Sequence, residues 1–313
     1  MKLFIKFWFG LALITWSLSA ESTVAHGQES GKTAGINSSD TQQADSDDDL
    51  ADEAFAATDE AELKKITPTS KFKEIIVFGV KVKAESLGRV EFPSHLKELT
   101  IAGFKRIEPK NFPRISHLKQ LQYLSIQRAE VSDKCLMELK QLTELRRLLL
   151  PFTNITDATL SGVSNLPKLE SLMLPGTKIS DDGLSKLAGL KKLKSLWVDR
   201  TALTDKAAQH LSKMTQLESL FLDGTKITEK GLGQLESLQS LKVLSIPAKI
   251  TDNAATSLAK LAKLELLYVG TLDDHLTAPE AALQKKQYLA SQAALQRLQK
   301  ENPKLEILAG IKL

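Results

Sequence analysis

The side chains that most often carry out catalysis or bind metals are few in this sequence and are scattered along it. The five histidines lie at unrelated positions of the chain: His26, His95, His117, His210 and His275. Apart from the local cluster Asp273-Asp274-His275, none of them has a cysteine or a carboxylate at metal-ligand spacing. A tight turn explains that cluster more simply than a metal site does. The sequence therefore predicts no bound metal.

The single cysteine, Cys135, excludes an intrachain disulfide and a paired-cysteine metal motif. It lies in DKCLMELKQL, a stretch that we interpret as helix, and is predicted to be a small apolar core residue. The acidic run DSDDD at 45–49 lacks the glycine and the terminal glutamate of a calcium loop. No nucleophile elbow, P-loop or dinucleotide fingerprint is present. We therefore expect no enzyme and no cofactor, with a hydrolase assembled from distant residues as an alternative.

The first 27 residues have the order of an export signal. Lys2 and Lys6 precede an apolar run from Phe7 to Leu18, and small residues follow it. The run is short for a transmembrane helix, which needs about 20 apolar residues, although an uncleaved anchor is the alternative. No later segment is apolar enough to span a membrane. The sequence thus predicts an exported protein of the periplasm, the cell envelope or the extracellular space.

Charge is distributed unevenly along the rest of the chain. Residues 21–70 hold twelve Asp and Glu and three Lys and Arg, a net charge of −9, whereas residues 71–313 hold 37 Lys and Arg and 26 Asp and Glu, a net charge of +11. Residues 28–70 are predicted to be a disordered acidic tail. Within it, residues 28–65 contain few large apolar side chains and are expected to be removable without unfolding the rest. The basic part could attract an anionic polymer, although a solvated lysine-rich surface is the simpler reading, and nothing indicates specific nucleic-acid binding.

A repeat of about 24 residues runs through the chain from residue 72 onward. Nine segments share the pattern LxxLxL or a close variant, and they begin at Phe72, Leu96, Leu121, Leu145, Leu169, Leu193, Leu217, Leu241 and Leu264. The steps between them are 24, 25, 24, 24, 24, 24, 24 and 23 residues, and a tenth segment begins at Leu305. Such regular spacing indicates a solenoid in which similar units stack and share one core.

Each middle unit continues with a turn threonine and an Ile-Thr-Asp-like triplet. The turn threonines are Thr153, Thr177, Thr201 and Thr225. In each triplet the Ser or Thr fits a helix N-cap, and the acid that follows favours the positive end of a helix. Leucines at helical spacing come next, for example Leu184, Leu187 and Leu190. Every unit is therefore predicted to contain one strand and one short helix.

These features resemble the leucine-rich-repeat family, in its form with about 24 residues per unit and a TxITDxGLxxLxxL helix segment. TKISDDGLSKLAGL at 177–190 matches that pattern closely, and secreted bacterial proteins often look like this. The resemblance covers about residues 71–313. It implies an α/β solenoid, or horseshoe, with a parallel sheet on the concave side and short helices on the convex side. It also implies that the turn threonines satisfy backbone groups between successive coils.

Three segments are thus predicted: a signal peptide at 1–27, the acidic tail at 28–70 and a leucine-rich-repeat domain of about ten units at 71–313. IPAKITD at 246–252 lacks the turn threonine, and we expect a change in curvature there. The period breaks after Thr271, and a long helix is expected from Thr277 to Asn302. Residues 272–313 are therefore interpreted as the C-terminal cap, with a partner-binding helix as the alternative.

The concave face is where we expect a partner to bind. Alternate residues of a strand face opposite sides, so the fifth position of LxxLxL points away from the core. That column places Leu149, Met173, Trp197 and Phe221 in an exposed stripe about 15 Å long. The candidate partner-binding residues, in this column and beside it, are Arg147, Leu149, Phe152, Met173, Trp197, Asp199, Arg200, Phe221, Asp223 and Tyr268.

An apolar, aromatic centre with a charged rim is typical of a protein-binding hot spot. The same column could also reflect general strand preference, which favours Trp and Phe, or could be covered by the chain's own tail. The leading hypothesis is a non-catalytic scaffold that presents its concave face to a protein or peptide. Binding of an anionic polymer by the basic repeat domain is the main alternative.

Overall fold

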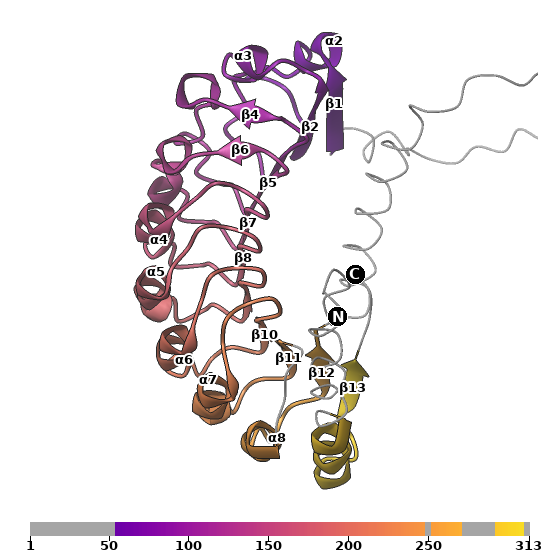
Figure 1. Ribbon diagram of the computed structural model, residues 1–313. Coiled ribbons are helices and arrows are strands. Elements are labelled where there is room, and N and C mark those ends of the chain that lie inside the picture. The colour runs from indigo at the N-terminus through magenta and orange to yellow at the C-terminus, as the bar shows by residue number, and fades with distance from the viewer. Residues whose placement is uncertain (1–53, 248–251, 271–291, 310–313) are drawn as a thin grey trace, which may run out of the picture. The chain divides into compact units, whose positions relative to one another are not determined.

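Residues 54–247, 252–270 and 292–309 are described in the computed structural model of the protein (Figure 1). They belong to the compact unit Ser46–Leu313 and form a parallel sheet of eleven strands that follow one another in chain order. These strands are β1 (Ala54–Asp59), β2 (Glu74–Lys81), β3 (Glu98–Ala102), β5 (Tyr123–Gln127), β7 (Arg147–Leu149), β8 (Ser171–Met173), β9 (Ser195–Trp197), β10 (Ser219–Phe221), β11 (Val243–Ile246), β12 (Leu266–Val269) and β13 (Glu306–Ala309). Two further short strands, β4 (Arg106–Ile107) and β6 (Glu130–Val131), pair with each other.

Short helices connect the strands and lie on the outer side of this unit, with the sheet on the inner side (Figure 1). The α-helices are α2 (Glu60–Leu63), α3 (Ala84–Leu87), α4 (Asp157–Val163), α5 (Asp181–Ser185), α6 (Asp205–Leu211), α7 (Glu229–Gly233) and α8 (Asp252–Ala259). Single 3₁₀ turns are η1 (Pro109–Asn111), η2 (Asp133–Leu136), η3 (Leu139–Gln141), η4 (Lys186–Gly189) and η5 (Gln234–Ser237). The predicted fold class, a solenoid with a parallel sheet and short helices, is confirmed.

The unit around Cys135 departs from the predicted helix. The stretch DKCLMELKQL forms the two 3₁₀ turns η2 and η3 instead of one α-helix. Ser132 makes no side-chain bond to the start of η2, whereas Thr156 caps α4 by accepting the Ala158 N–H. Cys135 is buried in the core, as predicted, and its Sγ lies 3.6 Å from the Ile107 carbonyl oxygen.

The prediction that an acidic tail extends to residue 70 is wrong for the part that follows residue 53. β1 pairs in parallel with β2, with Ala57 opposite Val77. Ala57 and Leu63 are buried in the core, and the ring of Phe55 stacks on Phe72 at 4.5 Å between centroids. This segment therefore has the core-forming side chains that we judged absent.

The step from β1 to β2 explains why the repeat pattern does not reveal the first strand. Ala57 lies 20 residues before its partner Val77, not 24, and an alanine occupies a position where the pattern has leucine, isoleucine or valine. The folded unit consequently begins before residue 71. The remainder of the predicted tail, 28–53, and the predicted signal, 1–27, lie outside the described residues.

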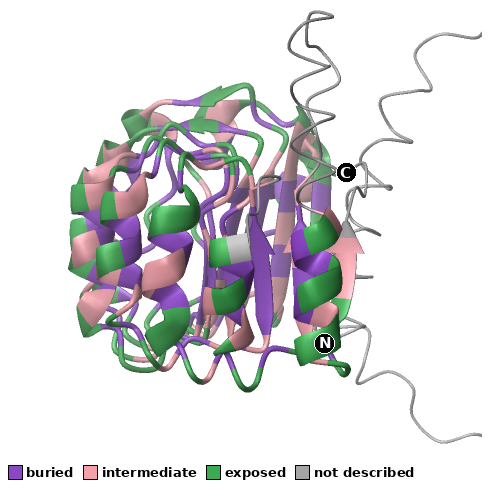
Figure 2. Cartoon of the chain, turned by 60° about the horizontal axis from the view of Figure 1, so that its bottom comes forward, coloured by how far each residue is buried: buried purple, intermediate pink, exposed green. Residues whose placement is uncertain are grey.

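The core lies between the sheet and the helices and is filled as the repeat predicts. The fourth and sixth positions of LxxLxL point inward, and Leu148 and Leu150 have no exposed surface. Figure 2 shows the same division on the helices, which are buried toward the sheet and exposed on the outside. The turn Thr153 donates its hydroxyl to the Leu150 carbonyl oxygen at 2.8 Å. This bond lies within one unit, not between successive coils as we expected.

The acids of four triplets also form hydrogen bonds to the next unit. Asp181 accepts the backbone N–H of Thr204 at 2.8 Å and its hydroxyl at 2.7 Å, and Thr204 in turn caps α6. The same bonds join Asp133 to Thr156, Asp157 to Ser180 and Asp205 to Thr228. We call this series the aspartate ladder. Each carboxylate fixes the N-cap of the next unit and so sets the stacking of the helices.

The aspartate ladder also explains the glycine of the repeat pattern. A Cβ at Gly183 would overlap the Asp157 carboxylate. Where the equivalent residue is not glycine, in α4, Thr159 donates its hydroxyl to Asp133 at 2.6 Å. In α6 the equivalent residue is Ala207, so the position takes a small residue or one that hydrogen-bonds the carboxylate.

At the C-terminal end, β13 adds to the sheet beside β12, with Tyr268 opposite Leu308. Residues 292–301 are helical and the helix ends before Pro303, as expected. The rest of the predicted long helix, the Asp273-Asp274-His275 cluster and most of the irregular IPAKITD segment lie outside the described residues. Within the described part, no helix has the length and apolar character needed to cross a bilayer.

Candidate partner-binding surface

The outward column of the repeat is continuous across the sheet. Leu149 lies opposite Met173, Met173 opposite Trp197, and Trp197 opposite Phe221 in successive parallel pairs. Ser245 of β11 follows Phe221, and Tyr268 of β12 follows Ser245 in the same row. Five of the ten candidate residues therefore share one row of the inner face.

The prediction that this row forms an exposed stripe is wrong at one end. Leu149 and Met173 are buried, with 7% and 4% of their surface exposed. On a sheet the side chains of adjacent strands stand about 4.8 Å apart, so a Leu or Met between filled positions keeps little free surface. The accessible part of the row begins at Trp197, whose ring is larger.

Three aromatic rings gather where the row stays accessible, and we call them the aromatic cluster: Trp197, Phe221 and Tyr268. All three are half-buried. Trp197 stacks on Phe221 at 3.7 Å between centroids, and Phe221 lies 6.1 Å from Tyr268. Buried Ser245 stands between the last two, and its small size lets the rings approach across its strand. The Trp197 indole N–H donates to Ser195 Oγ at 3.1 Å, and this bond orients the indole along β9.

Two acids stand next to the aromatic cluster on the strand continuations of β9 and β10, and we call them the carboxyl pair: Asp199 and Asp223. Both are turn residues, but the parallel ladder continues to them, because the Asp199 carbonyl accepts the Gly176 N–H and the Asp223 carbonyl accepts the Arg200 N–H. We therefore place each acid on the face of the cluster residue two positions before it. Burial raises the pKa of Asp199 to about 6, an effect that the Asp199 backbone N–H and Arg200 oppose and Asp223 reinforces. Oδ1 of Asp199 is buried, and within the described part of the chain it has no hydrogen-bond partner.

The Asp223 carboxylate lies against Gly270, which follows β12, two strands further along the sheet. Burial likewise raises the pKa of Asp223, while the Gly224 backbone N–H and Arg200 lower it. A Cβ at Gly270 would overlap the Asp223 carboxylate, so the glycine leaves the room that this carboxylate occupies. Gly270 and Ser245 are not among the predicted site residues. Their only signal in the sequence is a small residue in a column that holds Phe221 one strand earlier or Asp223 two strands earlier.

Phe152 and Arg200 lie on the loop edge of the same face. Both adopt the left-handed backbone region, with φ of 54° and 55°, and the next units have Gly176 and Gly224 at the same position. A Cβ at Gly176 would meet the Phe152 ring, and one at Gly224 would come close to the Arg200 side chain. Each bulky residue thus covers the glycine that follows. Phe152 remains 48% exposed, one of the few large apolar side chains on the surface.

Arg147 lies away from the aromatic cluster. Its guanidinium pairs with Glu98 at 3.2 Å and sits over the Tyr123 ring at 4.8 Å from the centroid. These partners come from β3 and β5, whereas the cluster begins on β9. The structure therefore brings together Trp197, Phe221, Tyr268, Asp199 and Asp223, and leaves Arg147 in contacts with its own sheet.

Comparison with models of known families and with curated proteins finds no match. Among solved structures, the chain is similar to the octameric complex of Latrophilin 3, Unc5D and FLRT2, whose FLRT2 part is a leucine-rich repeat. The TM-score is 0.52, with 14% identity and coverage of 82% of this chain and 83% of that one. It is also similar to internalin C2 and internalin F of Listeria monocytogenes. Their TM-scores are 0.48 and 0.37, with 20% and 19% identity. The match with internalin C2 covers 67% of this chain and 83% of the internalin chain, and the match with internalin F covers 70% of this chain and 78% of the internalin chain.

The chain has the leucine-rich-repeat fold. The repeat spacing, the parallel strand order and the likeness to a solved leucine-rich-repeat chain agree on this point. The fold by itself does not assign a function, which depends on the residues displayed on it.

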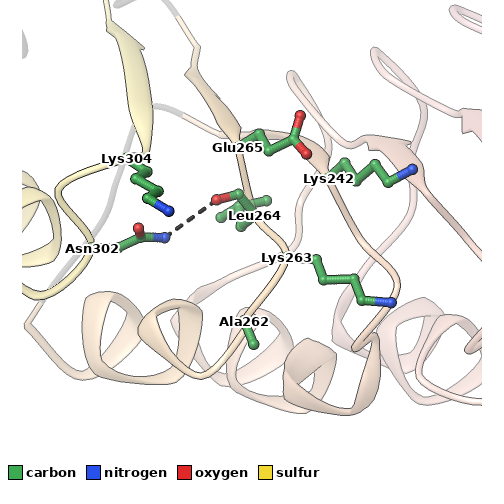
Figure 3. A pocket seen from close by; sticks show the side chains of 7 residues that line it. All are labelled: Lys242, Ala262, Lys263, Leu264, Glu265, Asn302 and Lys304. Atoms are coloured by element: carbon green, nitrogen blue, oxygen red, sulfur yellow. Dashed lines mark hydrogen bonds between the residues drawn. The ribbon is translucent and has the colours of Figure 1, made fainter.

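A small hollow of about 240 Å³ lies at the start of the last strands of the leucine-rich repeat (Figure 3). Its lining includes Lys242, Lys263 and Lys304, and Asn302 donates its side-chain N–H to the Leu264 carbonyl oxygen at 3.2 Å. Glu265 also lines it, and Lys242 is paired with Glu218 at 2.8 Å. The hollow thus gathers positive charge, but part of that charge is already neutralised.

Within the described residues, no group of three or more His, Cys, Asp or Glu side chains is placed to hold a metal ion. His117 uses its Nε2 in a bond to the Phe92 carbonyl oxygen at 2.8 Å, and His210 belongs to α6 on the helical side. Neither lies on the sheet face that holds the aromatic cluster. The chemistry that this leucine-rich repeat displays there is apolar contact, ring stacking and two carboxylates.

Proposed function

We propose that this protein is a non-catalytic binding scaffold that holds a protein or peptide on the concave face of its repeat domain. The partner contacts the aromatic cluster, with the carboxyl pair and Phe152 at its edge. The observation that carries this proposal is the stacked, half-buried aromatic row on a rigid sheet. Aromatic side chains at the centre of an interface supply most of its binding energy.

Two further points support the proposal. The solved chain with the same fold is part of a complex with other proteins. In addition, no group of three or more His, Cys, Asp or Glu side chains among the described residues is placed to hold a metal ion at the cluster. The proposal includes export of the protein to the periplasm, the cell envelope or the medium, where an extracellular or envelope partner would be met.

Selection of phage-displayed random peptides against the full chain tests the proposal. Selected peptides should bind a Trp197→Ala/Phe221→Ala variant at least about 30-fold more weakly, as truncation of hot-spot residues does. Met137→Ala is the matched control, because Met137 is 68% exposed and lies between η2 and η3, away from the sheet. The thermal midpoint of each variant shows that it is folded.

The outcome that contradicts the proposal is binding that the double variant leaves unchanged while it stays folded. Unfolding of the double variant would instead show that the two rings belong to the core. Binding of heparin that collapses between about 50 and 200 mM salt, and that ignores the double variant, would favour the anionic-polymer alternative. The hollow lined by Lys242, Lys263 and Lys304 is where that alternative would be sought.

A further inference from the structure

We infer that the concave site recognises a lysine or arginine side chain of its peptide partner, held by the carboxyl pair, with apolar residues beside it on the aromatic cluster. This inference rests on the proposed function and names the chemistry of the partner. It follows from the position of Asp199 and Asp223, from the buried Oδ1 of Asp199 that has no hydrogen-bond partner among the described residues, and from the rings next to them.

The carboxyl pair lies in a row that has prolines on both sides of it. The residues that occupy this row in successive units are Pro151, Pro175, Asp199, Asp223 and Pro247. Prolines on both sides offer no backbone N–H to an acid. Neighbouring parallel strands are about 4.8 Å apart, so the two carboxylates lie close enough to share one cation. Gly270 leaves room for the Asp223 carboxylate at the far side of this group.

The carboxyl pair lacks the partners that other acids of this chain have. Among the described ion pairs, none involves Asp199, Asp223 or Arg200. The two carboxylates repel each other, and Arg200 is the basic group that acts on both of them. A buried carboxylate oxygen without a donor is unfavourable, and a donor from a bound partner removes that penalty.

The surroundings favour an organic cation over a metal ion. A divalent metal takes several oxygen ligands, and the described residues offer no third ligand here. A guanidinium or ammonium group instead donates hydrogen bonds to both carboxylates, and its aliphatic stem packs on a ring. Trp197 and Phe221 stand two residues before the two acids and provide that ring surface. The site is also a local acidic spot in a domain of net charge +11, which distinguishes it from the rest of the surface.

The test uses the phage-displayed peptides selected on the full chain and three variants. Selected peptides should carry a Lys or Arg next to apolar residues. They should bind Asp199→Asn/Asp223→Asn at least about 10-fold more weakly, as loss of a charge-assisted bond implies. Asp182→Asn is the matched control, because Asp182 is exposed on α5, on the helical side. It removes one charge and should leave the affinity unchanged. Trp197→Ala/Phe221→Ala reports whether a peptide binds the concave face at all.

A pH series gives an independent reading. A cation that needs the ionised carboxylate should lose about 10-fold in affinity between pH 7 and pH 5, because the pKa of Asp199 lies near 6. Burial raises the pKa of Tyr268 further above its ordinary value, so Tyr268 stays neutral throughout. The loss should be absent in Asp199→Asn/Asp223→Asn, and absent for a peptide in which citrulline replaces the arginine.

The outcomes separate this inference from the proposed function. Peptides that need Trp197 and Phe221 but show no Lys or Arg preference, or bind the Asn variant normally, overturn the inference and leave the scaffold in place. Selection that yields no peptide dependent on the two rings overturns both. Basic peptides that need the rings, weaken in the Asn variant and weaken at pH 5 establish the cation site.

Discussion

Replacing Asp199 by asparagine should make the protein more stable at neutral pH. The carboxylate is largely buried, its Oδ1 has no partner among the described residues, and its pKa is raised from 3.8 to about 6. A raised pKa means that the folded state binds the proton more tightly than the unfolded state. The ionised form therefore opposes folding, and this effect grows as the pH rises from the unfolded value to the folded one.

The magnitude follows from the shift. About two pKa units correspond to about 3 kcal/mol, which is an upper bound because the asparagine amide must also be accommodated. We expect Asp199→Asn to raise the free energy of unfolding by about 1 to 3 kcal/mol at pH 7. For a domain of this size each kcal/mol raises the thermal midpoint by about 2 to 4 °C. Below pH 4 the acid is protonated in both states, so the difference should disappear.

The assay is thermal unfolding of the full chain at pH 7, 6, 5 and 4, with the wild type and Asp199→Asn in parallel. Asp182→Asn, at an exposed position of α5, controls for the loss of one charge. A lower midpoint for Asp199→Asn at pH 7, or a difference that stays constant down to pH 4, would refute the reasoning. In the first case the carboxylate has a stabilising partner, and in the second its pKa is ordinary.

The remaining predictions concern the scaffold and its export. Asp181→Ala should lower the free energy of unfolding by about 2 kcal/mol, because the Thr204 N–H loses its acceptor, whereas Asp182→Ala should change it little. Equal effects of the two substitutions in urea titrations would show that the aspartate ladder does not stabilise the fold. Deleting 1–53 should leave the thermal midpoint unchanged, and deleting 1–65 should lower it by removing β1; the same midpoint for both would mean that β1 adds no stability. N-terminal sequencing of the exported protein should begin after Ser19, Ala20 or Gly27, and an intact Met1 would indicate an anchor.

The repeat spacing predicts the fold well because each unit repeats the same physical solution. Leucines at fixed spacing fill one core, and a Ser or Thr before an acid begins each helix, so the strands and most helices follow from the pattern. The pattern does not reveal β1 because the step to β2 is 20 residues and Ala57 stands where the repeat has a larger aliphatic residue. The link from Asp181 to Thr204 escapes it too, because a contact between units is not visible in the pattern of one unit.

The sequence predicts the site less completely than the fold, because the face on which a side chain lies does not determine how much of that side chain is exposed. Alternation places Met173 and Trp197 in the same row, and only the packing of neighbours separates a buried Met from a half-buried Trp. Similarly, the sequence places Asp199 beside Trp197 but does not reveal that Oδ1 of its carboxylate has no hydrogen-bond partner among the described residues. Such differences depend on side chains from three or four strands at once.

Aspartates in two parts of this fold meet opposite environments, and the contrast bears on function. Burial alone would raise the pKa of Asp133, but bonds from Thr156 and Thr159 lower it overall, so its charge stabilises the stacking of units. Asp199 meets burial without such donors, and its charge opposes folding. A repeat that can satisfy an acid with neighbouring threonines nevertheless displays this one unsatisfied, beside stacked rings on the inner face. Groups that reduce stability are commonly those that function requires, which is why the carboxyl pair is the part of this surface where we look for the partner's charge.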